Sequence, residues 1–280
     1  MFFDWLRRRR RERILAEPLP EGWREILERN LGCFGELDEE EQAHLCQLVQ
    51  VFVAEKHWEG LGGLEMTDEI KVTVAGQACV LILDLHHDLY RQVESILVYP
   101  STVVAPPPSQ GFGAVLTAPP PAAMPVLGQA FSRGPLILAW DAVRRGGADA
   151  RDGHNVVFHE FAHKLDMLGG AADGVPPLAD DETYARWVEV FERHWNELHA
   201  QQARGRRTFL DAYAGKSPAE FFAVATEQFF EQGATMKRKH PELYEVLRGF
   251  YRQDPAARQR RRSKDEGETQ TRRGRRSTKR

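Results

Sequence analysis

Two histidines and a glutamate lie within the five residues His159-Glu160-Phe161-Ala162-His163. Because residues four apart share one face of a helix, His159 and His163 can direct their imidazoles to one point. Zinc accepts imidazole nitrogen and prefers four ligands. Glu160 cannot be oriented as a third ligand from the same turn, but it can reach a water molecule held on the metal. This H-E-x-x-H spacing is typical of zinc peptidases, in which the glutamate is the general base.

The residues around this motif predict a buried helix. Most of them are apolar, namely Val156, Val157, Phe158, Phe161, Ala162 and Leu165. We expect Asp152 to cap the start of the helix and Gly169-Gly170 to end it. A buried helix seldom carries His-Glu-His unless these side chains are paired or bind a metal. We therefore interpret the motif as a metal site, with a structural histidine pair as the alternative.

A catalytic zinc site needs a third protein ligand, with water in the fourth position. Two downstream histidines are candidates, His194 and His199, both on an amphipathic helix predicted over 181–202. They are five residues apart and do not share a helix face well. We therefore expect both on the solvated side of this helix.

Two glutamates are the other candidates for the third ligand. Glu220 and Glu227 lie two turns apart on a helix predicted over 217–232 and share one face of it. Glu220 also fits the last position of a capping box that begins at Ser217, which would give it a structural role. Residue types and spacing leave both glutamates open.

The elements that must position these residues are mostly helices. Apolar periodicity predicts helices over 20–56, 181–202, 217–232 and 241–253. The segment 67–90 is rich in β-branched residues and could be a strand, but its length favours a buried helix. Short apolar runs predict strands at 95–104, 126–131 and 135–140. A Pro/Gly-rich loop over 105–125 is long enough to be a lid over a cleft or a plain linker. The predicted fold class is α+β, helix-dominated, with a small mixed sheet and an N-terminal helical region.

Three longer segments resemble the Mlc titration factor A family of zinc-dependent peptidases: HNVVFHEFAHKLDMLGG, the preceding GPLILAWDAV, and DAYAGKSPAEFFAVATEQFF. The resemblance covers residues 20–255 and leaves out the basic C-terminal tail. It implies a zincin core with a gluzincin-like site, related in layout to the catalytic domain of anthrax lethal factor. It also implies one zinc ion per chain, with Glu220 as the third ligand beside His159 and His163.

Further roles follow from this resemblance. Glu160 would take a proton from the zinc-bound water and pass it to the leaving amine. The related domain has a tyrosine seven residues before its glutamate ligand, and Tyr213 stands at that spacing, where its hydroxyl would donate to the developing oxyanion. A core aromatic with a satisfied hydroxyl is the alternative for Tyr213. Asp166 and Glu227 are candidate acceptors for a ligand imidazole, although Asp166 also fits a surface position at the helix end. The strand 136–140 is expected at a sheet edge, where it would pair with a peptide substrate.

Charge is distributed unevenly along the 280 residues, whose net charge is −3. Residues 1–13 carry +4 and residues 256–280 carry +8, so residues 14–255 carry −15. The tail has almost no apolar residues, and we expect it to be disordered. Contact with nucleic acid or an anionic surface is one interpretation of the tail, and a solubilising role is the other. No RRM, KH or zinc-finger signature accompanies it.

Compartment and redox state can also be predicted. No apolar run reaches the roughly 20 residues of a membrane helix. The apolar MFFDWL precedes the basic RRRRRER, which is the reverse of a secretory signal. We therefore expect a cytoplasmic protein without a transmembrane segment. The three cysteines are odd in number and form no C-x-x-C, so they predict neither a disulfide framework nor a metal site.

We expect four parts: a basic N-terminal segment (1–19), an N-terminal helical region (20–94), a zincin-like catalytic domain (95–255) and a disordered basic tail (256–280). The favoured function is a zinc metallopeptidase, aminopeptidase-like by resemblance, acting on a peptide or protein substrate. The alternative is a regulatory protein that sequesters a transcriptional repressor, with the zinc site secondary. Glu160 disfavours a purely structural zinc, because such a site needs four protein ligands and no base.

Overall fold

The computed structural model describes residues 2–101, 103–104, 125–126, 128–130 and 134–261. Ten labelled α-helices, a further helical segment at 255–261 and six short strands lie within these residues, which confirms the helix-dominated α+β class. The Pro/Gly-rich segment 105–124 and the tail from residue 262 onward lie outside the described residues. No helix in the described part of the chain is both long and apolar enough to cross a membrane.

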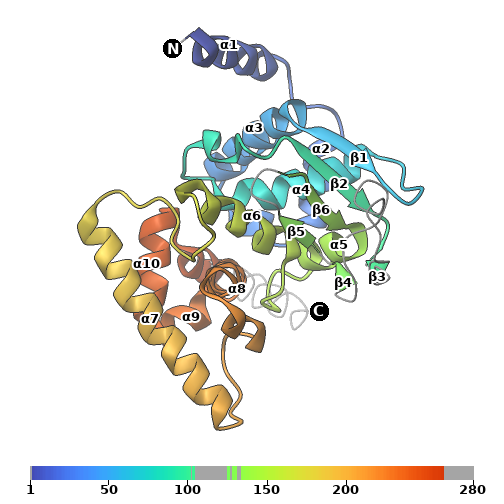
Figure 1. The fold of residues 1–280 in the computed structure, drawn as a ribbon. Coiled ribbons are helices and arrows are strands. Elements are labelled where there is room, and N and C mark those ends of the chain that lie inside the picture. Colours follow the sequence, from blue (N-terminus) through green and yellow to red (C-terminus); the bar gives the residue numbers. More distant parts are fainter. Residues whose placement is uncertain (1, 102, 105–124, 127, 131–133, 262–280) are drawn as a thin grey trace, which may run out of the picture.

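A mixed four-stranded sheet has the strand order β1-β2-β6-β5 (Figure 1). β1 (His57–Gly60), β2 (Ser95–Tyr99) and β6 (Leu136–Ala139) are parallel, and β5 (Gly128–Ala130) pairs antiparallel with β6. A separate ribbon pairs β3 (Val103–Val104) with β4 (Pro125–Val126). The prediction that 136–140 forms an edge strand is wrong, because β5 covers the side of β6 away from β2.

Ten helices surround and extend this sheet. They are α1 (Phe2–Ala16), α2 (Trp23–Asn30), α3 (Glu39–Glu55), α4 (Asp68–Leu81), α5 (Trp140–Ala148), α6 (Val156–Asp166), α7 (Asp181–Ala203), α8 (Pro218–Glu231), α9 (Gly233–Lys239) and α10 (Pro241–Tyr251). α4 packs on α2, α3 and α6, while α6 packs on α8 and α10 packs on α7 and α9. In Figure 1, α7, α9 and α10 lie on the side of α8 away from the sheet.

One hydrophobic core runs through both of the central parts predicted from sequence. It includes Leu45 and Val74 from the region 20–94 and Phe161 and Phe221 from the region 95–255. The region 20–94 is not wholly helical, since it contributes β1 to the sheet. Helix α6 therefore rests on side chains from both regions.

Helix α6 begins at a cap that differs from the predicted one. The Asn155 side chain accepts the backbone N–H groups of Val157 and Phe158 at 3.1 and 3.0 Å, which satisfies two donors of the first turn. Asp152 instead accepts the N–H of His154 at 2.8 Å, so the prediction of Asp152 as cap is wrong by three residues. The helix ends in a 3-10 turn and Gly170, whose φ of 121° suits glycine, as predicted.

Two other predicted segments have different bounds. The helix predicted over 67–90 ends at Leu81, because Ile82 and Leu83 bond three residues back and tighten the last turn. A short 3-10 turn follows at His87–Tyr90. The disorder predicted from residue 256 is wrong for 256–261, since 255–261 are helical and Ala256 is fully buried. Arg258 is also buried and bonds Glu41 at 2.7 Å, which fixes this turn to α3.

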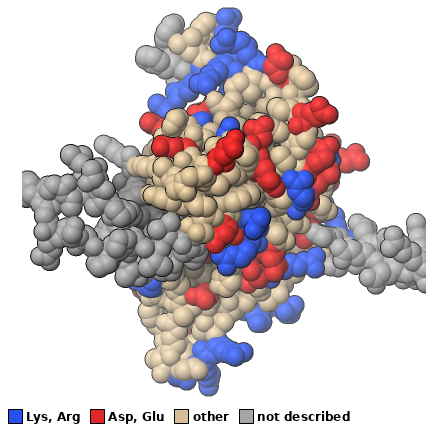
Figure 2. Space-filling model, turned by 90° about the vertical axis from the view of Figure 1, so that its right-hand side faces the viewer, with Lys and Arg blue, Asp and Glu red and all other residues tan. Residues whose placement is uncertain are grey.

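Basic side chains gather on the N-terminal helix. Five consecutive arginines of α1 occupy positions 7–11, and Figure 2 shows Lys and Arg concentrated at the top of the molecule, where α1 lies. Arg11 bonds Glu55 and Asp88, which ties α1 to the acidic body. The basic N-terminal segment 1–13 and the acidic residues 14–255 are therefore in contact through these ion pairs.

Candidate metal centre

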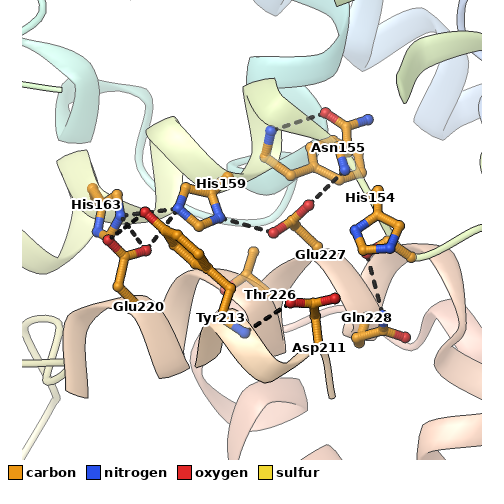
Figure 3. A network of polar contacts seen from close by, with 12 residues as sticks. His154, Asn155, His159, His163, Asp211, Tyr213, Glu220, Thr226, Glu227 and Gln228 are labelled. Atoms are coloured by element: carbon orange, nitrogen blue, oxygen red, sulfur yellow. Dashed lines mark hydrogen bonds and ion pairs between the residues drawn. The ribbon is translucent and has the colours of Figure 1, made fainter. Parts of the chain in front are cut away.

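Three side chains from two helices converge on one point (Figure 3). His159 and His163 project from successive turns of α6, and Glu220 projects from the first turn of α8. His159 Nε2 lies 2.9 Å from Glu220 Oε2 and 3.2 Å from His163 Nε2. His163 Nε2 lies 3.4 Å from the same carboxylate oxygen. The packing of α6 on α8 thus brings together residues 61 positions apart.

The atoms that meet here fit a zinc ion. Two imidazole nitrogens and one carboxylate oxygen form a donor set that zinc prefers, with bonds of roughly 2.0–2.2 Å. Two Nε2 atoms at 3.2 Å can share at most one well-placed proton between them, so they satisfy each other poorly without a third group. Glu160 is not part of this set, which leaves a fourth position for water.

Glu227 holds His159 from the other side of the ring. Its Oε1 accepts His159 Nδ1–H at 2.8 Å, and its Oε2 accepts the backbone N–H of Asn155 at 2.6 Å. A proton on Nδ1 leaves the Nε2 lone pair directed at His163 and Glu220. Of the two glutamates left open by the sequence, Glu220 lies in the cluster with both imidazoles, and Glu227 lies on the other side of the His159 ring.

Protons and a metal ion compete for this cluster. Burial lowers the pKa of His159, but hydrogen bonds to Glu220 and Glu227 outweigh burial and raise it to about 10. Burial raises the pKa of Glu220, yet its bonds to both imidazoles bring it well below its ordinary value. Metal binding at such a site releases protons, because a ligand imidazole must be neutral.

Glu160 points from α6 into a buried environment and is only 6% exposed. Burial raises its pKa to about 7, with opposing effects from the neighbouring imidazoles and added effects from Glu220 and Glu227. A carboxyl group whose pKa lies near neutrality can both accept and return a proton at physiological pH.

Tyr213 places its hydroxyl at the cluster. It lies in a 3-10 turn (Ala212–Lys216) that Asp211 caps by accepting the Tyr213 N–H at 2.7 Å. The hydroxyl donates to Glu220 Oε1 at 3.3 Å, and the ring centre lies 5.9 Å from that of His159. The side chain is 37% exposed, which does not match the alternative of a core aromatic.

Asp166 is fully buried at the end of α6, and within the described part of the chain its hydrogen bonds go to backbone N–H groups and not to an imidazole. Both of its oxygens accept the N–H of Gly174 at 3.0 Å. Gly174 has a φ of 81°, and a Cβ there would lie 2.5 Å from the carbonyl oxygen of Pro218. Asp166 thus holds the loop at Gly174 against Pro218, the first residue of α8, which lies two residues before Glu220.

The two histidines of α7 lie away from this cluster. The prediction of a solvated position is wrong for His194, which is 9% exposed and donates from Nδ1 to the Val190 carbonyl at 2.9 Å. His199 is exposed, as predicted. The apolar stripe of α7 is wider than its periodicity indicates, because α10 also packs on this helix.

Two supporting residues were not identified from sequence. Asn155 caps α6 and donates its N–H to Glu227, and Asp211 sets the turn that carries Tyr213. Both roles could have been predicted from residue type, because Asn and Asp favour the position just before a helix or a turn.

The chain is similar to known proteins over most of its length. A model of the family described as glucose-regulated metallo-peptidase M90 matches residues 4–252. An uncharacterised protein of Synechocystis is 36% identical over 255 residues, covering 91% of this chain and 90% of the relative. Mlc titration factor A of Serratia proteamaculans is 33% identical over 79% of this chain and 84% of its own length. The protein of that name from Yersinia pestis is 32% identical, with coverages of 84% and 86%.

Proposed function

The chain belongs to the glucose-regulated metallo-peptidase M90 family, and we propose that it hydrolyses peptide bonds with a water molecule activated at a zinc ion. The observation that carries this proposal is the convergence of His159 Nε2, His163 Nε2 and Glu220 Oε2 on one point. These three atoms would hold the ion. Zinc bound there would lower the pKa of its water and polarise the scissile carbonyl.

Glu160 is the proposed general base. It lies next to His159 on α6, and burial brings its pKa to about 7. It would take a proton from the attacking water and return it to the leaving amine nitrogen, so that one carboxyl group serves both steps. Glu160 is not one of the three side chains that would hold the ion, so its carboxyl group could carry the proton.

Tyr213 is the proposed oxyanion donor. Its hydroxyl already donates to Glu220 Oε1, and rotation away from that oxygen would direct the same O–H at the oxygen of the substrate carbonyl. Its partial exposure would let a substrate reach it. Glu227 and Asp166 are positioning residues, the first for the His159 ring and the second for the start of α8.

The substrate would lie along the outer edge of β5. Among the described strands, β5 is the last one of the sheet, next to α6, and the backbone groups on its outer side could bond an extended peptide. β5 therefore takes the role that the sequence indicated for 136–140. Aminopeptidase-like cleavage near a free N-terminus remains our proposal for specificity, on the strength of the family resemblance.

A second function is favoured by the names of the relatives. Two of them are called Mlc titration factor A, which suggests a repressor protein as partner. Under this proposal the chain would sequester such a repressor, and the metal centre would be secondary. The two functions are separable, because only hydrolysis requires Glu160.

Hydrolysis of a panel of fluorogenic aminoacyl and peptide substrates tests the first proposal. Wild type is compared with Glu160→Gln and with Glu39→Gln, an exposed control on α3, and bound zinc is measured in each protein. We expect Glu160→Gln to lose activity by a factor of about 10² or more while it keeps its zinc. Bound zinc without hydrolysis in wild type would instead favour the sequestering function.

A further inference from the structure

A second group of histidines and a glutamate lies in the helices beyond α8. His194 and Glu197 are three residues apart on α7, so they share one face of this helix. His240 lies between α9 and α10, and its ring contacts the ring of His194. Their potential ligand atoms all lie within 4.8 Å of one another. None of these residues belongs to the cluster on α6 and α8.

The imidazole of His194 is fixed with one nitrogen free. Nδ1 donates its proton to the carbonyl oxygen of Val190 at 2.9 Å, one turn earlier on α7. This bond sets the tautomer, so Nε2 carries a lone pair. A backbone carbonyl that holds the far nitrogen of a histidine is the arrangement by which proteins orient metal-ligating imidazoles.

His240 is held by its backbone and by an aromatic neighbour. Its N–H bonds the Met236 carbonyl at 2.7 Å, and its own carbonyl accepts from Tyr244, so the residue links α9 to α10. Its ring stacks on Phe209 at 5.4 Å and meets the His194 ring edge-on at 5.5 Å. It does not cap α10 with its side chain. The ring is therefore held in place by packing on Phe209 and His194.

Glu197 completes the group at its solvent side. It is exposed, and Gln201 donates to its Oε1 at 2.8 Å. One of its carboxylate oxygens lies within 4.8 Å of a ring nitrogen of each histidine. Two imidazole nitrogens and one carboxylate oxygen form the same donor set as the cluster on α6 and α8.

We propose that His194, Glu197 and His240 form a second site for a divalent transition-metal ion, with zinc as the best match to its ligands. Side-chain adjustments would bring the three atoms, which lie within 4.8 Å of one another, to the shorter separations of a tetrahedral site, and water could fill its fourth position. The ion would join the middle of α7 to the junction of α9 and α10. Arg193 and Glu242 already pair across these helices beside the site, so the ion would reinforce an existing contact.

Zinc stoichiometry tests this proposal without any measurement of activity. The full-length chain is stripped with a chelator and dialysed against stepwise increasing free Zn²⁺, and bound zinc is counted per chain. The variants are His240→Gln and Glu197→Gln, and the matched control is His199→Gln, an exposed histidine of the same helix. Glu197 is exposed, so its variant tests the site even if His240→Gln does not fold.

We expect two zinc ions per chain in wild type and in His199→Gln. His240→Gln should bind one, and Glu197→Gln should bind the second with a dissociation constant raised by a factor of about ten or more. Added zinc should also raise the Tm of wild type more than that of either variant. A single zinc in wild type at saturation that His240→Gln also retains would overturn the proposal. A second zinc whose affinity in both variants equals that in wild type would overturn it as well. His163→Gln should keep the second zinc, so the outcome is independent of the proposed hydrolysis.

Discussion

The two groups of histidine and glutamate differ in what surrounds them. The cluster on α6 and α8 is partly buried, and there Glu227 fixes one imidazole and the hydroxyl of Tyr213 donates to the carboxylate of Glu220. The group on α7 and His240 has one imidazole fixed by a backbone carbonyl, while its carboxylate is exposed. Among the described residues, no buried carboxyl group stands next to a histidine of the second group in the sequence, as Glu160 stands next to His159. We therefore propose that the same donor set supports hydrolysis in the first group and a cross-link between helices in the second.

Replacement of Glu220 should separate the two sites most clearly. Glu220→Ala removes the only carboxylate oxygen among the three converging atoms, so zinc should be lost from α6 and hydrolysis should fall to background. The zinc held by His194, Glu197 and His240 should remain. Zinc content and activity measured together check this. Full retention of activity would show that Glu220 is not a ligand.

Tyr213→Phe should lower kcat by a factor of about 10² with little change in KM or zinc content, because it removes one donor to the oxyanion. Tyr184→Phe is the matched control, since Tyr184 is 53% exposed on α7. Steady-state kinetics on the best substrate of the panel gives both constants. An equal loss in the two variants would speak against a role in the transition state.

Glu227→Gln should weaken zinc binding at α6 by about 10–100-fold, because the amide holds the His159 ring less firmly than a carboxylate does. Activity should recover when free zinc is raised. Competition with a chromophoric chelator measures the affinity. Loss of activity that excess zinc does not restore would contradict a purely positioning role.

The smallest effect concerns Glu231, which lies on α8 one turn beyond Glu227. Burial, together with Asp152 and Glu227, raises its pKa to about 9. The folded chain therefore keeps a proton that the unfolded chain releases above its ordinary pKa of 4.5, and the free energy of unfolding falls as pH rises between these values. Glu231→Gln keeps an acceptor for the N–H groups of Gly153 and His154 and removes this loss.

The variant should be more stable than wild type at pH 8 by about 1 kcal/mol or more, which is roughly 2–4 °C in Tm. The difference should shrink towards pH 5. Thermal unfolding across this range measures it. A difference that does not change with pH would mean that Glu231 is ionised in the folded protein.

Local features of the site could be predicted from sequence. The helix around His159 and His163 and the start of α8 at Ser217-Pro218 follow from apolar periodicity and capping preference. The choice between Glu220 and Glu227 could not be made this way, because both share a face of α8 and only the docking of α6 distinguishes their positions. Family resemblance supplied the choice that spacing left open.

The errors have a common physical origin in distant contacts. The sequence predicts strands at both 126–131 and 136–140, but it does not show which strands pair, so the pairing of β5 with β6 could not be predicted. His194 was expected in solvent because the packing of α10 on α7 is not visible in the periodicity of α7 alone. Asp152 and Asn155 are both residue types that favour the N-cap position. Asn155 occupies it in α6, and its backbone N–H also bonds Glu227, which lies 72 residues further along the chain.

Anomalous diffraction at the zinc edge from crystals of the zinc-loaded chain tests the central claim most directly. We predict the strongest peak within bonding distance of His159 Nε2, His163 Nε2 and a Glu220 oxygen, with Glu227 bonded only to the outer nitrogen of His159. A peak coordinated by Glu227 in place of Glu220, or no peak beside α6, would contradict the account.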